Sequence, residues 1–147
     1  MTIEIKHQIG LGPIHDDALT IRTTVFVAEQ GVPMQLELDN PTVEATALHI
    51  VAYVDGKLAG TARVFEEQPG VWHVQRVATL YPMRGQGIGR QLFAYIEKLA
   101  PGYHIQALEL GAQVQAKGFY ENLGFQAFGD EFYEADILHI NMKKELV

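Results

Sequence analysis

The sequence predicts a mixed α/β fold, with helices on both faces of a largely antiparallel central sheet. Segments of two-residue and of helical periodicity follow one another in the order β-α-β-β-β-α-β-α-β. Turn signals at Asp55-Gly56 and at residues 68–70 join consecutive strands as hairpins, which are antiparallel. The 147 residues include 48% hydrophobic and 20% charged residues, an ordinary globular composition without a repeat or linker. We therefore expect one domain over residues 1–147.

The first half of the chain carries most of the expected strands. Alternating or apolar runs rich in β-branched residues predict strands at 2–9, 45–54, 57–67 and 71–80. Between the first two, residues 13–30 have helical periodicity, with Ile14, Ala18, Ile21, Val25 and Ala28 on one face, and Gly31-Val32-Pro33 should end this helix. Residues 31–44 contain two prolines and several acids without a period, which predicts a loop whose acids Glu37, Asp39 and Glu44 are solvated.

The second half begins with a glycine-rich loop at residues 84–90. It lies between the strand ending near Leu80 and a helix with an apolar stripe formed by Ile88, Leu92, Ile96 and Leu99. A further strand is expected at 104–110, a helix at 112–122 ended by Gly124, and a last strand at 136–143.

The glycine-rich loop predicts an anion site. A helix N-terminus offers unpaired N–H groups and the positive end of the helix dipole. Glycine lets that backbone approach a ligand without a Cβ in the way. Arg84 and Arg90 flank the three glycines and could pair with phosphate oxygens. The expected ligand is a phosphate or pyrophosphate, although a plain tight turn would carry the same residues.

Composition excludes several classes of function. The absence of cysteine rules out disulfides, thiolate nucleophiles and cysteine metal sites. The net charge of −7 argues against nucleic acid as a partner. No apolar run approaches the roughly 18 residues that cross a bilayer, and no signal-peptide pattern is present, so we expect a cytoplasmic protein with no membrane partner. The six histidines show no local metal-ligand spacing, so no metal is expected.

Two motifs in this order resemble the GNAT acetyltransferase superfamily. The first is Arg84-x-x-Gly87-x-Gly89, between a strand and a helix. The second is residues 119–125, Phe-Tyr-Glu-Asn-Leu-Gly-Phe, with Ala116 and Gln113 ahead of it. The segment at residues 22–31 is similar to the bacterial ElaA-like and YjcF-like branch.

The resemblance implies an acetyl-CoA site and a catalytic tyrosine. The strand before the loop would pair with the pantetheine amides, as a peptide adds to a sheet edge. Tyr120 would protonate the departing thiolate, since a phenol with an ordinary pKa near 10 is protonated at neutral pH. The expected cofactor-binding residues are Val77, Ala78, Thr79, Arg84, Gly85, Gln86, Gly87, Ile88, Gly89, Arg90, Gln113 and Tyr120.

The acceptor amine is cationic and must lose a proton before it attacks. Candidate bases are His73, His49, Glu29 and Glu109, of which we select His73 because histidine has the best intrinsic pKa for the task. The resemblance places the acceptor pocket beside the first helix, its following loop and the centre of the sheet. The expected substrate-binding residues are Arg22, Glu29, Gln30, His49, Arg76 and Glu109, with Glu37, Asp39 and Arg63 as further candidates.

The expected function is that of an acetyl-CoA-dependent N-acetyltransferase acting directly on a small primary amine in a ternary complex. Without cysteine, no thiol can carry the acetyl group between two half-reactions. An acetyltransferase acting on protein or peptide amines, and a non-catalytic acyl-CoA-binding module, remain alternatives. The resemblance is also compatible with a homodimer.

Overall fold

The computed structural model describes residues 2–38 and 40–146, which form a seven-stranded sheet in the order β1-β2-β3-β4-β5-β7-β6. The strands are β1 (Ile3–Ile9), β2 (Leu48–Val54), β3 (Lys57–Gln68), β4 (Val71–Thr79), β5 (Ala107–Gln113), β6 (Gln126–Glu134) and β7 (Ile137–Glu145). Within the described residues, β4 and β5 are the only neighbours that run parallel. The expected fold class, mixed α/β around a largely antiparallel sheet, is confirmed.

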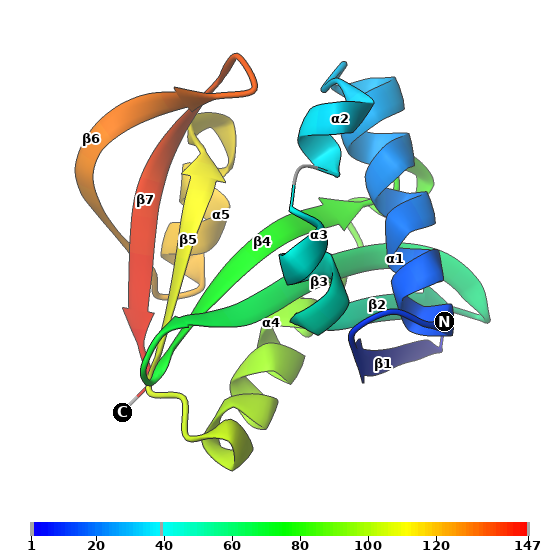
Figure 1. The fold of residues 1–147 in the computed structure, drawn as a ribbon, viewed down its shortest axis with the longest axis horizontal. Coiled ribbons are helices and arrows are strands. Elements are labelled where there is room, and N and C mark those ends of the chain that lie inside the picture. Colours follow the sequence, from blue (N-terminus) through cyan, green and yellow to red (C-terminus); the bar gives the residue numbers. More distant parts are fainter. Residues whose placement is uncertain (1, 39, 147) are drawn as a thin grey trace.

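Helices cover both faces of the sheet (Figure 1). On one face, α1 (Pro13–Arg22) and the π-helix η1 (Thr23–Glu29) bury Ala18, Ile21 and Val25 against the sheet. On the other face, α4 (Ile88–Leu99) buries the expected stripe against a larger core. Alternate residues of β2 pack into the two cores: Ile50 and Ala52 face α4, and Val51 faces α1. The remaining elements are α2 (Met34–Glu37), α3 (Pro41–Thr46), α5 (Lys117–Asn122), and the 3₁₀ turns η2 (Tyr81–Met83), η3 (Ala100–Tyr103) and η4 (Val114–Ala116).

The segment from residue 13 to residue 46 differs from the prediction in two ways. The expected helix is α-helical only to Arg22 and then widens into η1, with Gln30 N donating to Val25 O at 3.0 Å. The change of period turns Ala28 out to solvent, away from the expected apolar face. The predicted loop contains α2 and most of α3, which ends at Thr46 within the strand predicted at 45–54, and Asn40 caps α3 by accepting from Val43 N at 3.1 Å. These helices are four and six residues long, too short for a periodic pattern to reveal.

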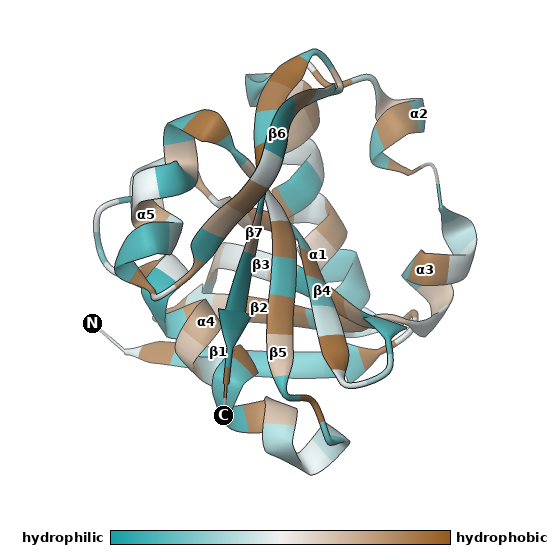
Figure 2. Cartoon of the chain, turned by 90° about the vertical axis from the view of Figure 1, so that its left-hand side faces the viewer, coloured by the Kyte–Doolittle hydropathy of each residue, from teal (hydrophilic) through white to brown (hydrophobic). Residues whose placement is uncertain are grey.

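The strand β6 was not predicted. It lies at the outer edge of the sheet beside β7 (Figure 2). Most of its residues are exposed, and Gly129 interrupts it with a φ of 74°. An edge strand with no buried face has no alternating pattern, so only its pairing with β7 defines it.

The elements around β5 are displaced from their predicted positions. The strand predicted at 104–110 lies at Ala107–Gln113, and the helix predicted from residue 112 begins at Lys117, after η4. Ala112 pairs with Ile140 of β7, so tertiary strand pairing overrides the helical spacing at this point. Gly124 ends α5 with a φ of 98°, as expected. None of the helices formed by the described residues is long and apolar enough to span a membrane.

Candidate active site

The two parallel strands separate halfway along their length. The β4–β5 ladder runs from Val71 opposite Ala107 to Val74 opposite Leu110, and beyond it β4 continues to Thr79 while β5 continues to Gln113, paired along its whole length with β7 on its other edge. Among the described residues, the edge of β4 that faces β5 therefore has no strand partner from Gln75 to Thr79. A strand edge of this kind can accept an extended ligand that carries amides.

A β-bulge at Arg76 marks the start of this open edge. Gln75 pairs with Arg63 and Ala78 with Thr61, so three steps along β4 oppose two along β3. Arg76 has a φ of 55°, the left-handed region that side chains rarely adopt. The extra residue exchanges the two faces of the strand: Val74 packs in the α4 core before it, and Ala78 packs in the α1 core after it.

The glycine-rich loop follows η2 and forms the N-terminus of α4. Gly87 is the N-cap with a φ of 80°, and no heavy atom lies within 4 Å of where its Cβ would be. Residues 84–87 are exposed, so the first N–H groups of the helix lie beside open space. Gly60 of β3 allows the close approach of α4, because a Cβ there would lie 2.9 Å from Ile88 Cγ2. This geometry fits a pyrophosphate.

The first arginine of the loop is already paired. The Arg84 guanidinium donates to both carboxylate oxygens of Glu29, at 2.6 and 2.9 Å, and its Nε donates to Thr79 O at 2.9 Å. The hydrogen bond from Arg84 lowers the pKa of Glu29, which therefore stays ionised. Glu29 thus links the end of η1 to the glycine-rich loop. Arg90 and Gln86 are exposed.

The gap between the separated ends of β4 and β5 is called the opening below. Gln113, the last residue of β5, lies on its β5 side. Its Nε2 donates to Gln30 Oε1 at 3.0 Å. This contact joins the start of the segment after η1 to β5, across the open edge of β4. The structure therefore brings two of the predicted site residues, one from each list, within hydrogen-bond distance.

Tyr120 lies on α5 in an aromatic cluster of the core on the α4 side of the sheet. Its ring makes edge contacts with Phe93, Phe119 and Phe125 at centroid distances of 5.1–5.8 Å, and the residue is 8% exposed. Burial raises the pKa of the Tyr120 phenol well above its ordinary value, so the group is protonated over the whole working range of pH. Such a phenol can donate a proton or a hydrogen bond.

His73 lies on β4 at the closed end of the opening, one residue before the ladder ends. Its Nδ1 is 3.0 Å from Glu67 Oε2, which leaves Nε2 for another partner. Burial lowers the pKa of His73 despite the opposing charges of Glu67, Glu109 and Glu134. The imidazole is consequently neutral at neutral pH and can accept a proton.

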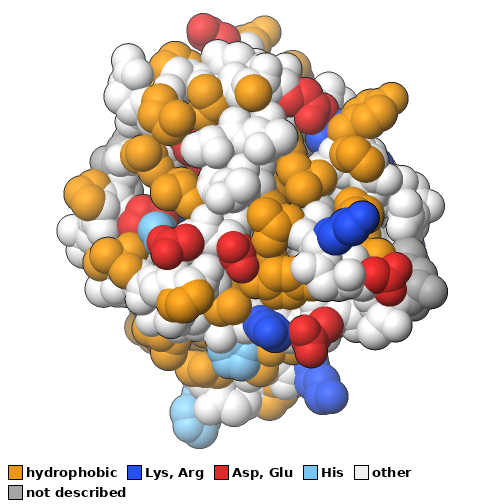
Figure 3. All heavy atoms as spheres, turned by 90° about the vertical axis from the view of Figure 1, so that its right-hand side faces the viewer, with side chains coloured by type: hydrophobic (Ala, Val, Ile, Leu, Met, Phe, Trp, Pro, Cys, Tyr) orange, Lys and Arg blue, Asp and Glu red, His pale blue; other side chains and the backbone are white. Residues whose placement is uncertain are grey.

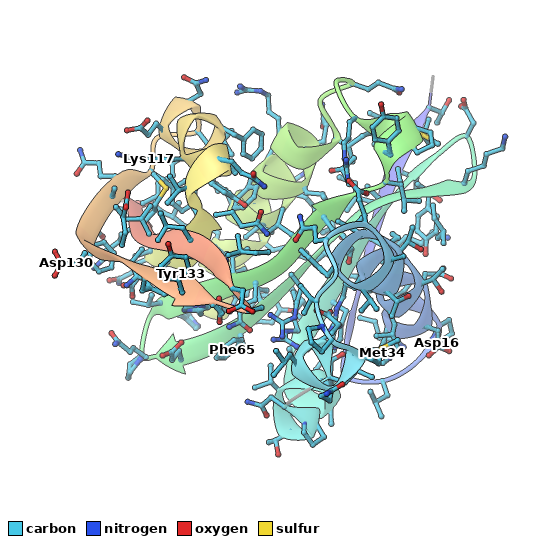
Figure 4. All side chains as sticks on the ribbon, turned by 90° about the horizontal axis from the view of Figure 1, so that it is seen from above. Asp16, Met34, Phe65, Lys117, Asp130 and Tyr133 are labelled. Atoms are coloured by element: carbon cyan, nitrogen blue, oxygen red, sulfur yellow. The ribbon has the colours of Figure 1, made fainter. Side chains whose placement is uncertain are left out.

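The surroundings of His73 are acidic and aromatic. Phe65 of β3 contacts its ring at a centroid distance of 5.5 Å. Seen from above, Phe65 lies between the β6–β7 hairpin, which carries Tyr133, and α2, which begins at Met34 (Figure 4). Sequence reasoning missed Glu67 and Phe65. The hairpin turn at residues 69–70 was the available signal, since strands paired across it bring both close to His73.

Beneath this surface lies a buried ion network centred on Arg22 and Glu44. Arg22 Nε donates to Glu37 Oε1 at 2.6 Å and Arg22 Nη1 to Glu44 Oε1 at 2.7 Å. Arg63 donates to the other oxygen of Glu44, and His15 Nε2 lies 2.8 Å from Glu44 Oε1. The face that carries α1 shows separate acidic and basic side chains among hydrophobic ones (Figure 3).

The network changes the interpretation of several predicted residues. The expectation that Glu37 and Glu44 are solvated loop acids is wrong: they are 3% and 7% exposed, because Arg22 and Arg63 neutralise them. Arg22 and His49 have no exposed surface, so their geometry gives no support for direct contact with a substrate. His49 Nε2 instead bonds to the Glu44 carbonyl at 2.8 Å. The predicted residue Asp39 lies outside the described residues.

Three network residues have ligand atoms close enough together to resemble a metal site. These atoms of His15, Glu44 and His49 all lie within 4.8 Å of one another. His15 is 29 residues from Glu44 in the sequence, so local spacing could not predict the group. Both oxygens of Glu44 already accept from guanidinium groups, whose positive charge opposes a dication. We therefore assign the group to ion pairing.

The network predicts a loss of stability in acid. Burial raises the pKa of Glu44, but hydrogen bonds from Arg22 and His15 and the charge of Arg63 outweigh it and lower the pKa from 4.5 to about 2. The stabilisation is present above pH 4.5 and is lost as the pH falls towards 2. The free energy of unfolding, measured in urea, should fall by about 3 kcal/mol over this range.

Glu44→Gln tests the assignment of that acid dependence. The variant should be less stable at pH 7 and should lose less stability than the unmodified protein between pH 5 and pH 2. Glu131→Gln, an exposed site on β6, is the matched control and should retain the full dependence. An equal dependence in Glu44→Gln and the unmodified protein would contradict the assignment.

Comparison with known proteins agrees with this geometry. Residues 16–146 match the family model described as an acetyltransferase (GNAT) domain. The chain is 34% identical over 130 residues to the uncharacterised N-acetyltransferase YjcF of Bacillus subtilis, with 88% of this chain and 91% of YjcF covered. A Lactobacillus plantarum crystal structure superposes with a TM-score of 0.89 at 26% identity and covers 100% of both chains. Escherichia coli ElaA superposes with a TM-score of 0.83 at 26% identity, covering 98% of this chain and 100% of ElaA. The chain therefore belongs to the GNAT acetyltransferase family, with ElaA and YjcF among its relatives.

Proposed function

We propose that the protein is an acetyl-CoA-dependent N-acetyltransferase that moves the acetyl group directly to a primary amine of a small molecule. The observation that carries this proposal is the open edge of β4, from Gln75 to Thr79, which leads to the exposed N-terminus of α4. The edge can pair with the pantetheine amides and the helix N-terminus with the pyrophosphate. Acetyl-CoA supplies an activated thioester when it is bound there.

The residues around the opening divide the proton transfers between them. His73 Nε2 accepts a proton from the ammonium group of the acceptor, directly or through water. The neutral amine nitrogen then bonds to the acetyl carbon, the carbon–sulfur bond breaks, and the nitrogen loses its second proton to water. Tyr120 provides the proton that turns the leaving thiolate into a thiol. Glu67 holds the imidazole through Nδ1, and Glu109 and Glu134 favour a cationic acceptor near it.

A thiol-release assay tests the proposal. Acetyl-CoA binding is first measured by calorimetry. A thiol reagent then follows release of coenzyme A across small amines, polyamines, amino sugars and peptides. The chain contains no cysteine, so the reagent reports only released coenzyme A. Turnover on a small amine supports the proposal, turnover on peptides alone favours a protein acceptor, and binding without turnover on any class favours a binding module. No binding would contradict the cofactor assignment.

A cytoplasmic location and a homodimer stay predictions.

The role of His73 predicts a particular pH profile. The kcat/KM of the unmodified protein should rise with pH through a midpoint below 6.5, because the pKa of His73 is lowered by burial. In His73→Gln this acidic limb of the pH profile should disappear, and the rate should fall about 100-fold. Glu67→Gln should move the midpoint to lower pH, because the charge of Glu67 raises the pKa of His73.

His104→Asn is the matched control for the imidazole substitution. His104 is exposed at the end of η3 with a φ of 61°, a conformation that asparagine tolerates. Its profile should match that of the unmodified protein. An acidic limb that survives His73→Gln at an unchanged midpoint would assign the proton acceptance to another group.

A further inference from the structure

The bulged residue of β4 is held by an acid from α2. Glu37 Oε2 lies 3.2 Å from Arg76 Nε, and the Glu37 carbonyl accepts from Arg76 Nη2 at 3.4 Å. The same carboxylate accepts from buried Arg22 at 2.6 Å through its other oxygen. Glu37 is 3% exposed, so it is fixed between an arginine of α1 and the arginine of the bulge.

The bulge needs support because its backbone conformation is unfavourable. A residue other than glycine at a φ of 55° is strained and persists only where its surroundings impose it. Collapse of the bulge would return β4 to simple alternation. Val77 and Ala78 would then exchange faces, since it is the extra residue that places Ala78 in the α1 core.

We propose that Glu37 is a positioning residue that holds Arg76 in its left-handed conformation and so sets the direction of the open β4 edge towards acetyl-CoA. This proposal rests on the proposed function. Glu37 touches neither substrate. It acts through Arg76, and Arg22 in turn fixes Glu37 against α1. The segment that follows the first helix is thereby connected to the cofactor strand.

The backbone effect can be separated from the side-chain effect at the bulge itself. Arg76→Gly removes the side chain but adopts a positive φ without strain, whereas Arg76→Ala removes the side chain and keeps the strain. Acetyl-CoA affinity, measured by calorimetry, should fall about tenfold in Arg76→Ala and less than threefold in Arg76→Gly. These variants leave the Arg22–Glu37 pair in place.

Glu37→Gln completes the test as a double-mutant cycle. Alone, it should weaken acetyl-CoA binding about tenfold, and combined with Arg76→Gly it should cause no further loss. A merely structural role of Glu37 would weaken binding equally in both backgrounds. Circular dichroism shows which variants are folded. If Glu37→Gln does not fold, the comparison of Arg76→Ala with Arg76→Gly tests the proposal by itself.

Three further results would overturn the proposal. One is equal weakening by Arg76→Ala and Arg76→Gly, which would mean that the arginine side chain contacts the ligand. Another is unchanged affinity in both of them, and the last is unchanged affinity in folded Glu37→Gln. Failure of the proposed function itself gives a different result, because the unmodified protein would then not bind acetyl-CoA.

Discussion

Gly87→Trp is expected to abolish acetyl-CoA binding while leaving the fold intact. Gly87 is the N-cap of α4, and the space around its Cβ position is empty to 4 Å. An indole there would fill the approach to the first N–H groups of the helix, where we place the pyrophosphate. Affinity measured by calorimetry should fall more than 100-fold. The buried residues of α4 begin at Ile88 and do not involve the loop.

A control must account for the backbone strain of this substitution, because any side chain at a φ of 80° is strained. Gly56→Trp provides it: Gly56 has a φ of 82°, also has no heavy atom within 4 Å of its Cβ position, and lies in the β2–β3 hairpin. Both variants should lose a similar amount of stability, and only Gly87→Trp should lose binding. Unchanged affinity in folded Gly87→Trp would refute the assignment of the loop to acetyl-CoA.

Tyr120→Phe is expected to lower kcat by roughly 10²–10⁴-fold with little change in acetyl-CoA affinity. The substitution removes only the hydroxyl and keeps the ring among Phe93, Phe119 and Phe125. Thermal stability should therefore stay close to that of the unmodified protein. Because burial raises the pKa of Tyr120, its deprotonation should produce no alkaline limb in the pH profile of the unmodified protein.

Tyr103→Phe is the matched control for loss of a phenol. Tyr103 lies in η3 and is 41% exposed, packed on Trp72. It should keep full kcat. Full activity in Tyr120→Phe would remove the general-acid role, and a selective loss of acetyl-CoA affinity would replace it with a binding role.

The local features of the fold and of the cofactor loop could be predicted from the sequence. Asp55-Gly56 predicts a hairpin, and both residues adopt positive φ, at 50° and 82°. The apolar spacing of Ile88, Leu92, Ile96 and Leu99 predicts a helix, and α4 spans Ile88–Leu99. The three glycines predict an open helix N-terminus, and Gly87 forms it. Each signal acts within one turn or one helix, so it needs no knowledge of distant contacts.

The rest of the candidate site depends on contacts between distant segments. The open edge of β4 exists because its pairing with β5, a strand that begins more than 20 residues after β4 ends, stops at Val74 opposite Leu110. Glu37 and Glu44 resemble solvated loop acids until the fold brings Arg22 and Arg63 to them. The sequence by itself thus determined the family resemblance, most of the elements and the anion loop, through local periodicity and turn chemistry. Only the tertiary structure decided the bulge, the buried ion network and the surroundings of His73, because long-range pairing and the neutralisation of buried charge leave no local pattern.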